Sequence, residues 1–225
     1  MTGHADALRA RRLRSPGALL AGVWLVAVVA ISATLGFREG HLTQVLACSP
    51  ARLASGDAWT LLTSAMIIDG PPVPQILGAA LVIALVVQDY GARVLWGTMI
   101  LGHVGATLVA YAGIGLLWLV DRDDVRSVVH APDYGISAIW AAALGAVAIA
   151  GARPPSSHPR FGLAVAILCV LVLVVLIPAH GELADVEHLL AFILGAGVGL
   201  AHRRTPAMAA VQPGEDSHAA LSGRS

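Results

Sequence analysis

The chain has 225 residues, of which 57% are hydrophobic and only 12% are charged, and its formal net charge is zero. Soluble domains carry about 25% charged residues. Together with a mean hydropathy of +0.77, this composition excludes a nucleic-acid-binding protein and a soluble enzyme, and it predicts an all-α membrane protein. All 14 basic residues are arginine. Because this bias is typical of GC-rich bacterial genomes, we expect a multi-pass protein of a bacterial plasma membrane.

Six long runs without charge divide the chain between residues 15 and 202. A helix needs about 20 apolar residues to cross the hydrocarbon core, and a spanning segment must satisfy its own backbone hydrogen bonds. We therefore expect a bundle of six transmembrane helices. Their approximate ranges are 15–37, 70–88, 94–120, 134–152, 161–179 and 183–202. The first run is too long for a simple secretory signal and is expected to be retained.

The arginines predict the orientation of these spans. With the N-terminus inside, ten of the 14 arginines fall in cytoplasmic segments and ten of the 14 acidic residues fall outside. This asymmetry is typical of bacterial membrane proteins, and a five-helix count would spoil it. We expect both termini to be cytoplasmic, with 1–14 as a basic N-terminal segment and 203–225 as a flexible tail.

The connection between the first two expected spans, residues 38–69, is long for a loop without structure. Its apolar stretch 58–68 is too short to cross a membrane. We expect this stretch to lie in the membrane interface or to dip into the protein.

Polar residues within the spans are the candidates for function, because burying them in a membrane costs free energy. They are Gln75, His103, Ser137 and His188, with His180 at an edge. No span carries a carboxylate, Lys or Arg at its centre, which disfavours an ion-coupled transporter. His103 is expected to pack or hydrogen-bond between helices. No ligands converge at its depth, so no metal site is predicted.

Ser137 and His188 are expected at similar depth near the outer membrane face, because both spans run inward. A serine hydroxyl becomes a nucleophile when a base accepts its proton, and histidine is the usual base. Each residue begins a row of small residues that lets helices approach closely. The rows are Ser137, Ala141 and Gly145 on one span, and His188, Ala191, Gly195 and Gly199 on the other. The pattern predicts a Ser–His dyad.

Simpler interpretations remain for the same residues. Ser137 alone could be a small residue in a helix interface, and His188 alone an interfacial histidine. His180 could replace His188 as the base, although it lies in the outer loop and precedes no row of small residues. His130 and Asp133 are expected in a solvated loop.

The dyad and its surroundings resemble the rhomboid family of intramembrane serine proteases. Gly135-Ile136-Ser137 resembles the start of the family's Gly-x-Ser-Gly motif, and Leu144-Gly145-Ala146 resembles its continuation. The histidine with small residues three and seven positions later resembles the family's sixth helix. The segment Gly56–Thr63 resembles the one before its second helix, with Thr60 where the family has Arg, and Gly91 resembles the Gly that begins its third helix. The resemblance implies a six-helix fold, Ser137 as nucleophile, His188 as base and transmembrane protein substrates within the lipid bilayer, with no cofactor.

The chain departs from this family at several positions. Ala138 follows the serine where the family has glycine, and Ala141 stands where an aromatic residue is common, with Trp140 one position earlier. The His and Asn that help bind the oxyanion on the second helix are absent. Gln75 is expected to donate there instead, together with backbone N–H groups near Gly135 and Ser137.

Two alternatives therefore stay open besides the protease. One is a catalytically inactive rhomboid-like protein that binds transmembrane clients, in which the small-residue rows serve packing alone. The other is a small transporter, which would need a continuous polar path across the membrane. The polar residues lie toward one face only, and this ranks the transporter last.

Overall fold

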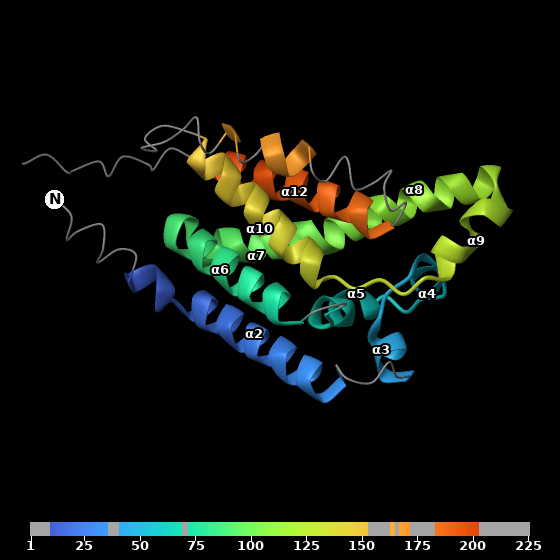
Figure 1. Cartoon of the computed structure of the whole chain (residues 1–225), viewed down its shortest axis with the longest axis horizontal. Helices are drawn as coiled ribbons and strands as arrows, with labels where there is room; N and C mark the ends of the chain where they lie inside the picture. The colour runs from blue at the N-terminus through green and yellow to red at the C-terminus, as the bar shows by residue number, and fades with distance from the viewer. Residues whose placement is uncertain are drawn as a thin grey trace, which may run out of the picture.

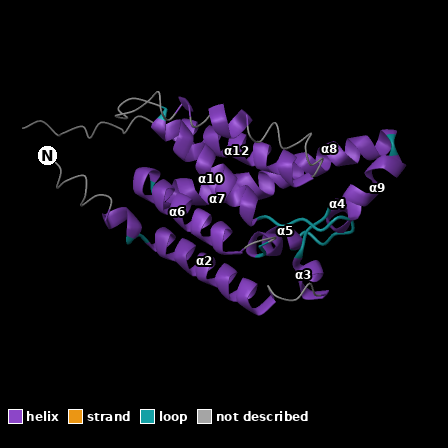
Figure 2. Cartoon of the chain, in the orientation of Figure 1, coloured by secondary structure: helices purple, strands orange, loops and turns teal. Residues whose placement is uncertain are grey.

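The computed structural model describes residues 10–35, 41–68, 72–152, 163–164, 167–171 and 183–202. These residues form helices joined by loops, and no strand occurs among them (Figure 2). A single pair of bridged residues, Cys48 and Asp133, joins two loops. The fold is therefore all-α over the described part of the chain, as the composition predicts.

The longest helices form a bundle, and shorter ones connect them (Figure 1). The bundle consists of α2 (Pro16–Leu35), α6 (Pro72–Tyr90), α7 (Ala92–Ile100), the π-helical segment η2 (Leu101–Gly105), α8 (Ala106–Val120), α10 (Ile136–Gly151) and α12 (Leu183–His202). The short elements are α3 (His41–Leu46), α4 (Pro50–Ala54), α5 (Thr60–Thr63), the 3-10 turn η1 (Ser64–Met66) and α9 (Arg122–His130).

Three described segments are long and apolar enough to cross a membrane: Pro16–Thr34, Ala92–Val120 and Leu183–His202. Two shorter apolar helices, Pro72–Gln88 and Ile136–Ile149, lie beside them. These segments coincide with five of the six expected spans. The remaining one, 161–179, lies largely outside the described residues, as do 1–9 and 203–225. The described part of the chain is thus mostly helical and contains three candidate membrane spans, which is compatible with a membrane protein.

Gly91 makes the sharp turn between α6 and α7. Its φ of 88° lies in the left-handed region, which residues with a Cβ rarely adopt. Its N–H donates to the carbonyl groups of Val86 and Val87 at 3.2 and 2.9 Å, and these bonds close the end of α6. The chain can therefore reverse within one residue, and α6 packs directly against α7.

The largest apolar core lies where α2, α6, α7 and α10 meet. Leu95, Val86 and Ala143 are fully buried within it. Two polar side chains fasten the helices at this core. The Tyr90 hydroxyl donates to the Ala146 carbonyl at 2.8 Å, and Trp96 Nε1 donates to the Gly17 carbonyl at 3.0 Å. Both donors are satisfied by backbone carbonyls of neighbouring helices, so neither leaves an unpaired group in the core.

Helices α10 and α12 pack closely through their small residues. A Cβ added at Gly195 would overlap the Ala142 backbone, and one at Gly199 would lie 3.2 Å from the Ala146 Cα. A Cβ at Gly145 would overlap the Phe192 carbonyl oxygen. From the Gly195–Ala142 contact to the Gly199–Ala146 contact, both helices advance by four residues, so α10 and α12 run parallel in a fixed register. This register places the N-terminal ends of the two helices side by side.

Ala141 and Ala191 belong to the same contact. They are 2% and 0% exposed, and they share a small apolar cluster with Ala106 of α8. The cluster contains only alanines at its centre, so the three helix backbones can approach one another as small residues allow.

We predict that Gly195→Ala destabilises the protein by about 1–3 kcal/mol, because the added methyl group meets backbone that cannot move aside. The matched control is Gly197→Ala on the same helix, where an added Cβ has nothing within 4 Å. Both changes gain the same helix propensity, about 1 kcal/mol. The unfolding free energy of each variant in detergent micelles measures the difference. Equal stabilities would contradict the packing described for α10 and α12.

Candidate functional site

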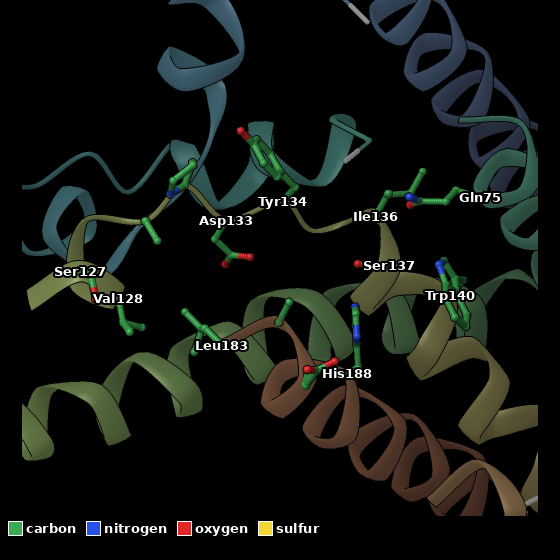
Figure 3. Close-up of a pocket in the computed structure, with 14 residues that line it drawn as sticks. Gln75, Ser127, Val128, Asp133, Tyr134, Ile136, Ser137, Trp140, Leu183 and His188 are labelled. Atoms are coloured by element: carbon green, nitrogen blue, oxygen red, sulfur yellow. The ribbon is translucent and has the colours of Figure 1, made fainter. Parts of the chain in front are cut away.

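A cavity of about 670 Å³ lies at the N-terminal ends of α10 and α12 (Figure 3). Its wall includes residues from α6, α9, α10, α12 and the loop that precedes α10. They are Gln75, Ser127, Val128, Ala131, Pro132, Asp133, Tyr134, Ile136, Ser137, Trp140, Leu183, Ala184, Asp185 and His188. The structure therefore brings Ser137, His188 and Gln75 to one pocket from three separate helices.

Ser137 and His188 face each other within this pocket. Figure 3 shows the serine hydroxyl and the imidazole ring turned toward one another. Ser137 lies in the first turn of α10, and His188 lies near the start of α12. No hydrogen bond joins the two side chains, both of which belong to the described residues. The structure therefore brings the two groups to one pocket without joining them directly.

Trp140 packs against the imidazole of His188. The two ring centroids lie 6.3 Å apart, and the rings are tilted by 30°. Trp140 is one turn after Ser137 on α10, so a single helix supplies both the hydroxyl group and the ring that restricts the histidine. The contact limits the orientations open to His188, and Ala141 at the next position is buried in the α10–α12 contact instead.

The position of Gly135 depends on a close contact with His103 of η2. A Cβ at Gly135 would overlap the His103 ring, and the Gly135 N–H donates to the Ser64 carbonyl at 3.0 Å. This N–H is therefore used inside the protein. Gly135 supports the site by letting the loop before α10 lie directly on His103, and Gln75 is the side chain that lines the pocket with an amide N–H.

His103 is buried in η2 and acts as a structural hydrogen-bonding group. Its Nε2 lies 2.6 Å from the Leu61 carbonyl oxygen and 3.3 Å from the Ser64 hydroxyl. Because the carbonyl can only accept, Nε2 carries the proton. The π-helical turn around His103 shifts the register between α7 and α8, as such turns do. Leu61 and Ser64, the two residues that contact His103, belong to the apolar stretch 58–68. This stretch therefore dips into the protein, and its Thr60 and Ser64 are fully buried.

The segment before α4 is fixed by Arg52. Its guanidinium pairs with Asp57 at 3.1 Å, donates to the carbonyls of Gln44 and Ala47 at 3.0 and 2.8 Å, and lies over the Trp59 ring. One cation therefore organises much of residues 41–68.

Asp133 is not in a solvated loop, so that expectation was wrong. Its side chain is only 7% exposed, and one carboxylate oxygen accepts from the Tyr111 hydroxyl at 2.8 Å. Its backbone exchanges two hydrogen bonds with Cys48, at 2.9 and 3.1 Å. No local pattern indicates these contacts, because Tyr111 lies 22 residues earlier.

Asp185 is a second acid in the pocket that the dyad hypothesis did not include. It is 6% exposed and lines the pocket one helical turn before His188. Here the sequence did contain a signal, since residues three apart lie on the same face of a helix.

Comparisons with protein-family models, curated proteins and solved structures found no match to this chain. Among the described residues, no group of three or more His, Cys, Asp and Glu is placed to hold a metal ion. The candidate site is therefore interpreted from its own residues, which include two serines, a histidine, a side-chain amide and two carboxyl groups around one pocket.

We predict that Tyr111 and Asp133 stabilise the fold as a pair. Replacing Tyr111 with Phe removes the hydroxyl donor and costs about 1–3 kcal/mol, because the buried carboxylate loses a hydrogen bond. A double-mutant cycle with Asp133→Ala, which removes the acceptor, should give a coupling energy of about 1 kcal/mol or more. Unfolding free energies of the two single variants and the double variant test this. Strictly additive effects would contradict the hydrogen bond.

Proposed function

We propose that this chain is a rhomboid-like intramembrane serine protease in which Ser137 and His188 form the dyad. The observation that carries the proposal is the pocket that joins Ser137, His188 and Gln75 from α10, α12 and α6. The proposal includes six transmembrane helices with both termini cytoplasmic, in a bacterial plasma membrane. It is supported by the composition, the arginine asymmetry and the five described apolar helices.

The chemistry follows from the groups in the pocket. The Ser137 Oγ attacks the carbonyl carbon of a peptide bond while His188 accepts the hydroxyl proton. His188 then returns this proton to the leaving amine as the C–N bond breaks, which leaves an ester on Ser137. A water molecule hydrolyses the ester with His188 again as the base, and the free carboxylate and the serine hydroxyl are regenerated.

The oxyanion of this reaction has two sources of stabilisation near Ser137. The first backbone N–H groups of an α-helix have no partner within the helix, and Ser137 lies in the first turn of α10. These N–H groups and the positive end of the helix dipole favour negative charge at this position. Gln75 faces the same pocket from α6 and supplies an amide N–H.

The position of the pocket suits a membrane-inserted substrate. Ser137 and His188 lie at the beginnings of α10 and α12, which are the outer ends in the proposed topology. Water reaches a site near the membrane surface more easily than one at the centre. The substrate class that fits is a transmembrane helix that unwinds near its outer end, as the resemblance implies.

We predict that a fluorophosphonate probe, which reacts with activated serines, labels the full-length protein in native membranes. Ser137→Ala should abolish labelling, because the nucleophile is lost. His188→Ala should slow labelling by about 10³-fold or more, because no base remains to accept the hydroxyl proton. In-gel fluorescence over time measures both rates.

Two control variants make this experiment specific. Ser127→Ala removes another serine that lines the same pocket, and His130→Ala removes an exposed histidine of α9; both should label as the wild type does. Labelling that survives Ser137→Ala would identify a different nucleophile. A folded wild type that does not label, beside a related protease that does, would favour the non-catalytic, client-binding alternative.

We predict that Gln75→Ala lowers the maximal rate of probe reaction by about 10²–10³-fold, since this is the usual cost of one lost oxyanion donor. Half-saturation by the probe should change little, because the oxyanion develops only as the bond to Ser137 forms. Probe concentration series for both proteins separate the two effects. A weaker half-saturation with an unchanged maximal rate would show that Gln75 binds the probe and does not stabilise the oxyanion.

A further inference from the structure

We propose that Asp185 is a positioning residue for His188: it orients the imidazole and stabilises the positive charge that His188 gains from the Ser137 hydroxyl. This inference rests on the proposed Ser137–His188 dyad and extends it to a three-residue arrangement in which the acid and the histidine share one helix. Neither the resemblance nor the small-residue rows assign such a role to Asp185.

The helix geometry brings the two side chains together. Asp185 precedes His188 by three residues on α12, and residues at this spacing have Cβ atoms about 5–6 Å apart. Side chains on a helix lean toward its N-terminus, so the imidazole of His188 leans over the turn that carries Asp185. Both residues line the same pocket.

The charged side chains that line the pocket together with His188 are both acidic, Asp185 and Asp133. Asp133 reaches the pocket from the loop before α10, where the Tyr111 hydroxyl holds its carboxylate. The 14 residues that line the pocket include no arginine. A proton that arrives on His188 therefore meets negative charge from its own helix and from the opposite wall.

The remaining neighbours of His188 leave this role to Asp185. Trp140 packs along the imidazole ring and offers no charge, and Ser137 supplies the proton. On the helix next to α12, His103 is engaged with the Leu61 carbonyl. With the ring packed against Trp140 on α10, a carboxylate one turn earlier on α12 favours orientations that turn an imidazole N–H toward it.

A carboxylate at this place has a large effect because the pocket is partly buried. Asp185 is 6% exposed, and charges interact more strongly in a low-dielectric interior than in water. The positive charge on His188 exists only after Ser137 has begun to transfer its proton. Asp185 therefore stabilises the transition state more than the resting protein, which is the requirement for a rate effect.

Glu187 is the matched control on the same helix. It is also a buried acid, 2% exposed, and it lies one residue from His188. Its carboxyl interacts with Asp133 and Thr107 and does not line the pocket. Replacing its carboxyl group by an amide should therefore leave the reaction of Ser137 unchanged, although both acids are buried near the start of the same helix.

The test measures how the full-length protein in native membranes reacts with the fluorophosphonate probe, with maximal rate and half-saturation determined separately. Losing an acid that is hydrogen-bonded to a catalytic histidine costs serine proteases about 10⁴-fold, and Asp185 acts without such a direct bond. We expect Asp185→Asn to lower the maximal rate by about 10–100-fold without changing half-saturation. Asp185→Glu should restore much of the rate, and Glu187→Gln should react as the wild type does.

The outcomes separate this inference from the proposed function. If Ser137→Ala abolishes labelling but Asp185→Asn reacts as the wild type does, the dyad stands and the role of Asp185 is refuted. If the wild type does not label at Ser137, both fail. If Asp185→Asn and Asp185→Glu lose rate equally and both unfold at lower temperature, Asp185 serves the fold alone and the inference is also refuted.

Discussion

The close packing of α10 against α12 is the constraint on which the rest of the site depends. At Gly145 and Gly195 each helix meets the backbone of the other, with no room for a Cβ. The side chains of serine and histidine are both short, so they can meet only if the helices that carry them lie this close together. The same contact fixes the axial register. Ser137 and His188 consequently begin their helices at the same end of the bundle and face one pocket.

A second set of contacts fixes the part of the pocket wall that comes from the loop before α10. The loop before α10 is bridged to Cys48 through Asp133, and Gly135 lies on the His103 ring. Residues 41–68, which Arg52 organises, thereby support the loop that leads into Ser137. The segment between the first two helices is thus part of the site's architecture.

The sequence predicted the helices and the small-residue rows because both are local features. Apolar length reports a membrane helix directly, and Ser137, Ala141 and Gly145 share a face by helical periodicity alone. The wall of the pocket could not be predicted in this way. Asp133 is buried through Tyr111 and Cys48, which are far from it in sequence, and no spacing reports such a contact. Asp185 is an intermediate case: its spacing from His188 can be read from the sequence, but its burial cannot.

The pocket also bears on whether the small-residue rows serve packing alone. A packing function requires small residues along α10 and α12, but it does not require a histidine whose ring faces a serine hydroxyl. Nor does it require two carboxyl groups beside that histidine, since burying acids in a membrane protein costs free energy. Asp133 and Asp185 are 7% and 6% exposed, so this cost is present in the fold. Acids placed where a protonated histidine would need them are consistent with a site that transfers protons, and they distinguish the start of α10 and α12 from the apolar contact further along the same two helices.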